Sequence, residues 1–480
     1  MMKNRPSSER VFSIFKALNQ IPRPSHHEER VADYLCQFAE RLHLDYERDA
    51  ANCVVIRKPA SKGYKRAEPV VLLNHMDMVC VGMRNPLTTP IETYTECGWM
   101  KARGTSLGAD NGIGLSMALA VLEDPDIIHG PLEVITTTNE EDGMSGASQL
   151  SPDFLRGRKV INLDSEDFDT ITTGAAGACL QFHEIPVRRQ KAPDGHEWLR
   201  ISFKGGLGGH SGVDINKGRV SATVVSAMIL TAISNVCELH LSYIKIGEAN
   251  ASIASTAEMI VCVPSGDVAF VRAQEEEMNY WWRKKFRNTD PDMRCHITVC
   301  GRQADVVNPE AFEVLMTCLN ATPQGVIKMS AEMERTVETS NNVGMVETRQ
   351  DCIFVSTHSR SFIDEDLERL AEDIASVFQA NGAVSRRVMM APAWQENQHS
   401  PFIQLTSDTF NDVLGWRPRM VAMHFVLEAG YFVQKYPGIQ IASIGPRIME
   451  PHSTSERVQL STVNDIWKVL IELLYRLATA

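Results

Sequence analysis

Val70-Val71-Leu72-Leu73-Asn74-His75-Met76-Asp77-Met78-Val79 is the segment from which the architecture of this chain is best inferred. Its continuous aliphatic run predicts a short buried strand of the kind found in parallel sheets. Because side chains alternate between the faces of a strand, His75 and Asp77 are expected on one face. Met76 and Met78 then lie in the packing on the other. An imidazole beside a carboxylate at a strand's carboxyl end is where open α/β sheets carry their chemistry, although an isolated pair is more often a satisfied core histidine.

Two further predicted strands end in acidic residues. The strand Leu132–Thr138 leads to Glu140 and Glu141, which in an extended backbone point to opposite sides and so have different roles. The strand Lys159–Leu163 leads to Asp164. One acidic loop is usually a solvated surface feature, but three successive strand ends finishing in acid or imidazole indicate a common site.

A glycine-rich segment, residues 104–114, precedes a helix of small and apolar residues at 115–122. Glycine lets the backbone approach another group closely. Asp110 lies at the turn into the helix, where, taken alone, it is more simply a helix N-cap. A phosphate-binding loop is disfavoured, because no Gly-Lys-Ser/Thr follows and a carboxylate repels phosphate.

Apolar spacing predicts helices at residues 8–20 and 26–43. Ser25, with an acid three residues later, predicts a capping box for the second helix. His26 and His27 are then exposed residues of its first turn.

The pattern of strands and helices changes between residues 186 and 395, where strands alternate with long helices. His210 lies there within a run of glycines, and Arg360 follows a predicted strand at 352–356, where a surface arginine is the simplest interpretation. Beyond residue 395 the earlier pattern resumes and includes His452. We therefore expect an α/β domain of residues 1–185 and 396–480, with a mixed central sheet flanked by helices, interrupted by an α+β domain of residues 186–395.

Composition excludes several classes of partner. Lys and Arg number 48 against 60 Asp and Glu, a formal charge of −12, which argues against nucleic acid or an anionic membrane surface. No apolar run is long enough to span a bilayer, and the first ten residues carry no signal-peptide pattern. The 11 cysteines have no regular spacing, which is typical of a reduced, cytoplasmic protein.

Five nitrogen and oxygen ligands fall on strand ends and loops of the predicted sheet: His75, Asp110, Glu141, Asp164 and His452. Zinc takes such ligands, and a catalytic zinc keeps one position for water. Five protein ligands suit two ions if one carboxylate bridges them, and Asp110 is the natural bridge. Burying three carboxylates without cations would be prohibitive. Glu140 is then free to act as general base, and Asp77 to orient His75.

These residues resemble the motifs of peptidase family M20, the zinc-dependent aminoacylase and dipeptidase clan, and in particular its bacterial aminoacyl-histidine (Xaa-His, peptidase D-like) dipeptidases. The motifs run through most of the chain: Pro22-Arg23-Pro24-Ser25-His26-His27-Glu28-Glu29, Asn74-His75-Met76-Asp77, Leu107-Gly108-Ala109-Asp110-Asn111-Gly112-Ile113-Gly114, Asn139-Glu140-Glu141-Asp142-Gly143, Leu163-Asp164-Ser165-Glu166, Gly208-Gly209-His210-Ser211-Gly212, Ser443-Ile444-Gly445-Pro446 and Pro451-His452-Ser453.

The resemblance implies a metallo-dipeptidase with two divalent ions, Zn²⁺ first and Mn²⁺ or Co²⁺ as alternatives, and a metal-activated water as nucleophile. It implies that Asp110 bridges, that His75 and Asp164 bind one ion, and that Glu141 and His452 bind the other. Glu140 would be the base. The inserted domain would act as a lid and homodimer contact, with His210 supporting the oxyanion and Arg360 holding the carboxylate of a small peptide substrate.

Two departures from the family pattern bear on specificity. Relatives carry Asn-Ala-Ile-Pro-Arg in the lid, whereas this chain reads Asn250-Ala251-Ser252-Ile253-Ala254-Ser255, so that Asn250 matches as a substrate-binding residue only with a shifted register. Cys80 replaces a proline that often follows the His-x-Asp strand. Two alternatives to a dipeptidase therefore stay open: an N-acyl amino acid deacylase of the same clan, and a non-catalytic binding protein on this fold.

Overall fold

A computed structural model describes residues 7–331 and 333–480, and within it the chain divides into two compact units. The first unit comprises the described residues up to Gly174 together with Trp394–Ala422 and Leu427–Ala480; the inserted unit comprises Ala175–Ala393 and Met423–Val426. The chain crosses at 174/175 and 393/394, and not at the expected 185/186 and 395/396. The reason is strand pairing, because β9 (Gly177–Pro186) pairs with β18 and β19 of the inserted unit, while β20 (Trp394–Gln395) joins the first unit's sheet.

The first unit is built on a mixed sheet with strand order β1-β2-β6-β3-β7-β22-β8-β20, with β21 paired to β8. Its centre is parallel, since β3 (Val70–His75) pairs in parallel with both β6 (Leu132–Thr137) and β7 (Lys159–Asn162). β7 also pairs in parallel with β22, while β2 and β8 are antiparallel to their neighbours β6 and β22. The remaining strands are β1 (Asp45–Arg48), β2 (Val54–Lys58), β8 (Thr170–Ala175), β21 (Arg419–Met423) and β22 (Gln440–Ser443).

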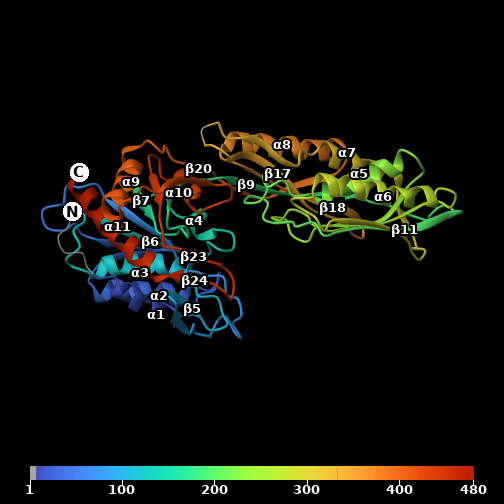
Figure 1. The fold of residues 1–480 in the computed structure, drawn as a ribbon. Coiled ribbons are helices and arrows are strands. Elements are labelled where there is room, and N and C mark those ends of the chain that lie inside the picture. Colours follow the sequence, from blue (N-terminus) through green and yellow to red (C-terminus); the bar gives the residue numbers. More distant parts are fainter. Residues whose placement is uncertain (1–6, 332) are drawn as a thin grey trace. The chain divides into compact units, whose positions relative to one another are not determined.

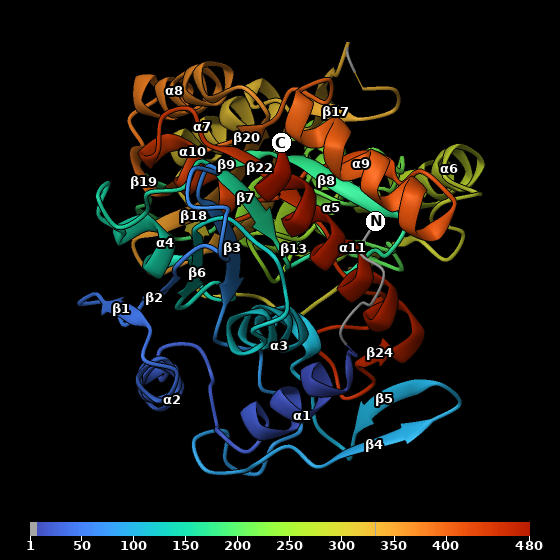
Figure 2. The same cartoon turned by 90° about the vertical axis from the view of Figure 1, so that its left-hand side faces the viewer.

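Both faces of this sheet are buried, which explains the continuous apolar run in β3. Val70 and Leu72 belong to a core shared with five helices, and the alternate residues Val71 and Leu73 are also fully buried. The five helices are α1 (Glu9–Leu18), α2 (Glu29–Arg41), α3 (Ala109–Glu123), α9 (Pro401–Leu414) and α11 (Leu460–Thr479). Figure 2 shows α1 and α3 packed side by side below the sheet. The unit also contains α4 (Ser145–Gln149), α10 (Ala429–Lys435) and a small sheet of β4 (Thr93–Glu96), β5 (Trp99–Ala102), β23 (Ile448–Met449) and β24 (Arg457–Gln459).

The predicted capping box at Ser25 is wrong. Helix α2 begins at Glu29, and its N-cap position is Glu28, without a side-chain cap. Ser25 Oγ instead donates a hydrogen bond to Asp77 Oδ2, at 2.8 Å. The hydroxyl group therefore bonds a residue distant in the sequence and does not cap the helix. His26 and His27 are exposed, as expected, but they precede the helix.

The inserted unit is an α+β layer, in which Figure 1 labels the helices α5 to α8. The strand order of its sheet is β14-β11-β13-β12-β17-β18-β9-β19, with β16 paired to β17. Four helices share a core with one face of this sheet: α5 (Ala222–Ser234), α6 (Val268–Lys285), α7 (Pro309–Ala321) and α8 (Asp364–Ala380). A smaller cluster, including Trp198 and Cys262, lies with the two-stranded ribbon β10 (Arg189–Gln190) and β15 (Val306–Val307). The other strands are β11 (His196–Lys204), β12 (His240–Ile246), β13 (Ala257–Pro264), β14 (Arg294–Val299), β16 (Gly325–Met329), β17 (Val337–Thr348), β18 (Cys352–Ser361) and β19 (Val384–Ala391).

Strand β18 continues to Ser361, five residues beyond its predicted end. Arg360 therefore lies inside the sheet and is only 3% exposed, so its interpretation as a surface arginine is wrong. Among the helices of the described residues, none combines the length and apolar content needed to cross a bilayer.

Candidate metal centre

The end of β3 is held by Arg23. The guanidinium of Arg23 donates through Nη1 to the carbonyl oxygens of Met76 and Asp77, both at 3.1 Å, and through Nη2 to that of Gly108, at 2.7 Å. Arg23 is 1% exposed, so these carbonyl oxygens replace water as its partners. One buried side chain thus ties the segment containing His75 and Asp77 to the glycine loop.

Asp77 is fully buried and joins His75 to the acidic turn that follows β6. Its Oδ1 lies 3.4 Å from His75 Nδ1, which is the geometry of a carboxylate that orients an imidazole. The backbone N–H groups of Glu140 and Glu141 donate to its two oxygens, at 3.0 and 3.2 Å. The extended backbone expected for Glu140 and Glu141 at the strand end is therefore wrong, because the two residues form a turn around Asp77.

The glycine loop before α3 closes around a carboxylate from the far end of the chain. Glu456 accepts hydrogen bonds from the N–H groups of Leu107, Gly108 and Ala109, at 2.7 to 3.0 Å. Gly108 has φ 67°, and a Cβ there would lie 2.6 Å from Arg23 Nη2, so glycine is required. The side chain of Asp110 does not cap α3: the backbone is kinked at Asp110, with ψ 113°, and its two carboxylate oxygens face His75 and His452.

The loop, the turn and the strand ends bring all five predicted ligands together in two groups. In one group, His75 Nε2 lies 3.2 Å from Asp110 Oδ1 and 3.3 Å from Asp164 Oδ1. In the other, His452 Nε2 lies 3.2 Å from Asp110 Oδ2 and 2.9 Å from Glu141 Oε2. Asp110 thus offers one oxygen to each group. Ligand atoms of His75, Asp110 and Glu141 all lie within 4.8 Å of one another.

These separations fit metal coordination. Ligands 2.0–2.1 Å from a tetrahedral zinc ion lie about 3.3 Å apart, close to the nitrogen–oxygen distances in both groups. The donor set of two imidazoles and three carboxylates is also one that zinc accepts.

The charges of the cluster also call for cations. Burial raises the pKa of Asp164 to about 7, and the negative charge of Asp110 adds to this rise. Burial raises the pKa of Glu166 to about 9, with repulsion from Asp110 and Asp164 adding to it. Hydrogen bonds to Asp110 and Glu141 raise the pKa of His452 to about 11. Without metal, therefore, protons must supply the positive charge that holds these carboxylates together.

Glu140 is 9% exposed, and its carboxyl group lies in the same field. Burial raises its pKa well above the ordinary value; His75 opposes this rise, while Asp164 and Glu428 add to it. Glu428 is itself buried and accepts a hydrogen bond from Thr137 Oγ1, at 2.7 Å. Burial raises the pKa of Glu428 to about 8.

Several supporting residues were given no role at this site in the sequence analysis. Asn111 Nδ2 donates to Asp164 Oδ1 at 2.6 Å, and Glu28 Oε1 accepts from the N–H of Asn139 at 2.9 Å. Arg23, Glu28 and Asn111 lie inside the motifs quoted in the sequence analysis, so membership of those motifs could have pointed to them. No sequence feature pointed to Glu456, because it lies in a polar loop that looks like solvated surface.

The three residues predicted to contact substrate all lie in the inserted unit. His210 Nδ1 accepts hydrogen bonds from the N–H groups of Gly212 and Val213, at 3.2 and 3.1 Å. Arg360 Nη2 donates to Ser211 Oγ at 3.3 Å, and its buried Nε has no protein partner. Asn250 Oδ1 is likewise buried without a hydrogen-bond partner.

Comparison with known proteins gives one consistent answer. The sequence model of peptidase family M20/M25/M40 matches residues 71–476. The chain is 33% identical to the cytosol non-specific dipeptidase of Escherichia coli (strain K12), over 98% of this chain and 97% of that protein. Its structure matches that of an aminoacylhistidine dipeptidase from Vibrio alginolyticus with a TM-score of 0.90 at 32% identity, covering 98% and 97% of the two chains.

A more distant match shows the fold alone. The aminopeptidase PepT from Bacillus cereus has a TM-score of 0.63 at 17% identity, covering 98% of this chain and 99% of that one. The family resemblance seen in the sequence motifs is confirmed by the first three comparisons. The chain belongs to peptidase family M20 and is a hydrolase.

Proposed function

We propose that this protein is a dipeptidase that works with two divalent metal ions. The observation that carries the proposal is the position of Asp110, whose Oδ1 and Oδ2 each face a different histidine at 3.2 Å. A carboxylate that presents one oxygen to each of two ligand groups is suited to bridge two ions. The Escherichia coli and Vibrio alginolyticus proteins described above are both named dipeptidases, which supports the reaction class.

In this proposal His75 and Asp164 would hold one ion, Glu141 and His452 would hold the other, and Asp110 would contribute to both. The borderline-soft imidazoles with hard carboxylates favour Zn²⁺, with Mn²⁺ or Co²⁺ as substitutes. When bound, such ions polarise a carbonyl group and lower the pKa of a bound water. Asp77 keeps His75 oriented with Nε2 toward the ligand group, because its carboxylate faces Nδ1.

Glu140 is the proposed general base. Its backbone is fixed by Asp77, and its carboxyl group is buried beside the ligands without being assigned to either ion. A carboxylate placed in this way can take a proton from water and later deliver it to the leaving amine. Bound cations would stabilise its ionised form against the repulsion of the neighbouring carboxylates.

His210 is proposed to stabilise the tetrahedral oxyanion. Because its Nδ1 accepts two backbone N–H groups, its proton lies on Nε2, which is a hydrogen-bond donor. Burial, with Arg360 nearby, lowers the pKa of His210 to about 4, so the ring is neutral at pH 7. A neutral donor of fixed tautomer is suited to an oxyanion hole.

Arg360 is proposed to bind the substrate carboxylate. Its buried guanidinium has no acidic partner in the salt bridges of the described residues, and its Nε lacks a hydrogen bond. Such a cation is available for the bidentate contact that a peptide C-terminus offers. Asn250, with its unpartnered Oδ1, is proposed as a further polar contact to substrate.

The inserted unit is also proposed to act as a lid and to form a homodimer. The dimer is supported by the exposed apolar side chains of Val224, Met228 and Trp281, which are 40, 54 and 55% exposed. Contiguous apolar surface of this kind marks association sites. A cytoplasmic location is supported by the relative's name and by cysteines that are all free.

The proposed substrates are short dipeptides, with Xaa-His among them. The names of the two dipeptidases differ in substrate: the Escherichia coli protein is called non-specific, and the Vibrio alginolyticus protein is called an aminoacylhistidine dipeptidase. The lid stretch beginning at Asn250 lacks the Pro-Arg of other members, so we expect specificity to differ from theirs and to include dipeptides without histidine.

The test is hydrolysis of β-Ala-His, Gly-Leu and an N-acetyl amino acid by the purified enzyme, before and after chelation and after return of Zn²⁺ or Mn²⁺. We expect chelator-sensitive, metal-restored cleavage of the dipeptides, and fewer metal ions bound per chain in Asp110→Asn than in the wild type. Cleavage of only the acetylated substrate would instead establish a deacylase. Dipeptide cleavage that is unaffected by complete metal removal would overturn the proposal.

A further inference from the structure

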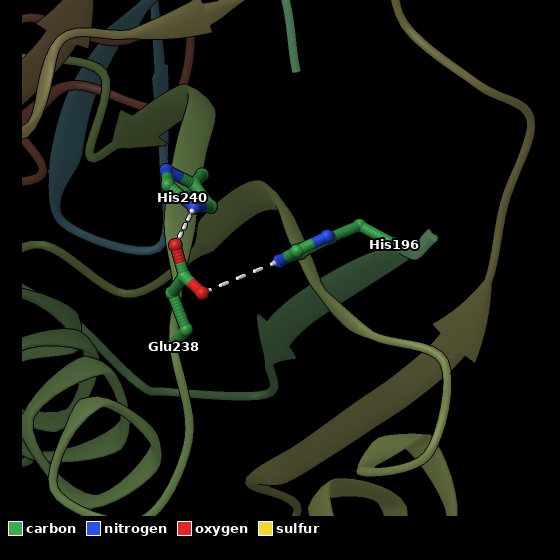
Figure 3. Close-up of side chains that lie close together, drawn as sticks. All are labelled: His196, Glu238 and His240. Carbon is green, nitrogen blue, oxygen red and sulfur yellow. Dashed lines mark hydrogen bonds and ion pairs between the residues drawn. The ribbon is translucent and has the colours of Figure 1, made fainter. Parts of the chain in front are cut away.

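The inserted unit contains a second group of metal-ligating side chains, which shares no residue with the cluster at Asp110. It consists of His196, Glu238 and His240, with one ligand atom of each within 4.8 Å of the others. Figure 3 shows the Glu238 carboxylate between the two imidazole rings. Glu238 Oε1 lies 2.8 Å from His240 Nε2, and Oε2 lies 4.0 Å from His196 Nε2.

The sheet brings the two histidines together. His196 is the first residue of β11 and His240 the first of β12, and both strands pair with β13, which lies between them. Their partners on β13 are Pro264 and Cys262, two residues apart, so both histidines lie on the same face of the sheet. The rings lean toward each other across β13 until their centroids are 5.4 Å apart.

A buried nitrogen without a partner is the second observation that indicates a ligand. The side chains of His196 and His240 are only 9 and 10% exposed. His196 Nε2 is buried and has no hydrogen-bond partner, and it faces Glu238. Its other nitrogen, Nδ1, lies 3.3 Å from the carbonyl oxygen of Asp194. That carbonyl can only accept, so it places the proton on Nδ1 and leaves a lone pair on Nε2.

We propose that His196, Glu238 and His240 bind one divalent transition-metal ion, of which Zn²⁺ is the best fit. Two neutral imidazoles and a carboxylate, with water in the fourth position, are a zinc donor set. Mg²⁺ and Ca²⁺ prefer all-oxygen sites and fit less well. Binding requires the three ligand atoms to lie about 3.3 Å from one another. The carboxylate of Glu238 can adjust because this side chain is 62% exposed, and the two imidazole rings would turn slightly to complete the set.

Neighbouring cations do not occupy the site. Lys191 and Arg302 each lie 3.8 Å from Asp194 Oδ1, so their charges are directed to that carboxylate. A bound ion would join the start of β11 to the start of β12 across β13. It would thereby stabilise this end of the inserted unit's sheet without touching the residues proposed for hydrolysis.

The experiment compares zinc bound by metal-free, full-length wild-type protein and His240→Gln, after incubation with micromolar Zn²⁺ and gel filtration. His296→Gln is the matched control, since His296 is an exposed histidine on β14 paired with Glu275 at 3.3 Å. We expect one zinc fewer per chain in His240→Gln and no change in His296→Gln. The readout is a difference between variants, so it does not depend on how many ions the Asp110 cluster holds, and dipeptide hydrolysis should be retained.

Equal zinc in wild type and His240→Gln would overturn the proposal. A difference that is seen only at millimolar zinc would also overturn it, because it would mean adventitious binding only. Glu238→Gln keeps the test decisive if His240→Gln folds poorly, because the exposed side chain of Glu238 makes little contribution to the core. We expect Glu238→Gln to bind zinc at this site at least about tenfold more weakly, which is the smallest loss typical for a residue that supports a metal ion. Unchanged affinity in that variant would also contradict the assignment.

Discussion

Glu140 is the residue at which the proposed chemistry is most directly tested. Glu140→Gln keeps the size and the backbone contacts to Asp77 but cannot accept a proton. We expect kcat to fall about 10³-fold while bound metal stays at the wild-type level. Steady-state kinetics and metal analysis on the same sample check this. Glu141→Gln is the contrast, because it is expected to lose metal as well as activity; a Glu140→Gln enzyme of full activity would exclude Glu140 as the base.

Asp77 is expected to act through His75 and through the turn at 140–141. Asp77→Asn retains the volume but removes the charge beside His75 Nδ1 and replaces one acceptor oxygen by a donor. We expect zinc affinity to fall about 10- to 100-fold, measured by competition with a chelating dye. Asp142→Asn is the control. Asp142 is an exposed acid of the same turn, and it pairs with His26 at 2.9 Å. Equal losses in both variants would mean that the turn, and not Asp77, matters.

At the level of elements, the glycine loop depends on Glu456. This carboxylate is 3% exposed and accepts four backbone N–H groups, those of residues 107–110, which lose this partner when it is removed. We expect Glu456→Ala to lower the free energy of unfolding by about 3 kcal/mol, since unsatisfied buried donors are costly. Denaturant unfolding of the metal-free protein measures this. Glu450→Ala, a half-exposed residue paired with Arg457, should change little; equal stability of the two variants would contradict the role of Glu456.

Elements with a strong periodic pattern were predicted well from the sequence. Helices α1 and α2 lie within the ranges predicted as helical, 8–20 and 26–43, and β3 is parallel to both neighbours, as its apolar run indicated. These patterns report burial, which is a local property of a helix face or a strand. Domain boundaries were less accurate, because β9 looks like a strand of either unit until its partners are known.

Side chains whose partners are distant in the sequence were predicted poorly. Ser25 and Asp110 both occur where local rules place a helix cap, yet Ser25 bonds Asp77 and Asp110 lies between two histidines. Glu456 bonds a loop 349 residues away, and no local pattern encodes that contact. The five proposed ligands nevertheless lie together. Three of them, His75, Glu141 and Asp164, follow neighbouring parallel strands, whose carboxyl ends meet at one edge of the sheet.

For the whole molecule, metal binding should be coupled to proton release. The pKa of His452 is raised to about 11 and that of Asp164 to about 7, so at pH 7 in the metal-free protein His452 carries a proton and Asp164 is partly protonated. Ligands must be deprotonated to bind a cation, so protons leave as zinc enters and affinity rises with pH. Calorimetric titration in buffers of different ionisation enthalpy measures the number released. A heat of binding that is the same in every buffer would contradict this.

The position of β22 in the middle of the first unit's sheet has a consequence for how the protein is made. Strand β22 lies between β7 and β8, although about 265 residues separate it from β8 in the sequence. While the ribosome is translating the inserted unit, the sheet therefore has an unfilled slot with exposed strand edges, and His452 and Glu456 have not yet been synthesised. A nascent chain cannot complete the candidate metal centre until those last elements emerge. If this centre carries the activity, as proposed, we expect peptide hydrolysis to begin only after nearly the whole polypeptide has been translated.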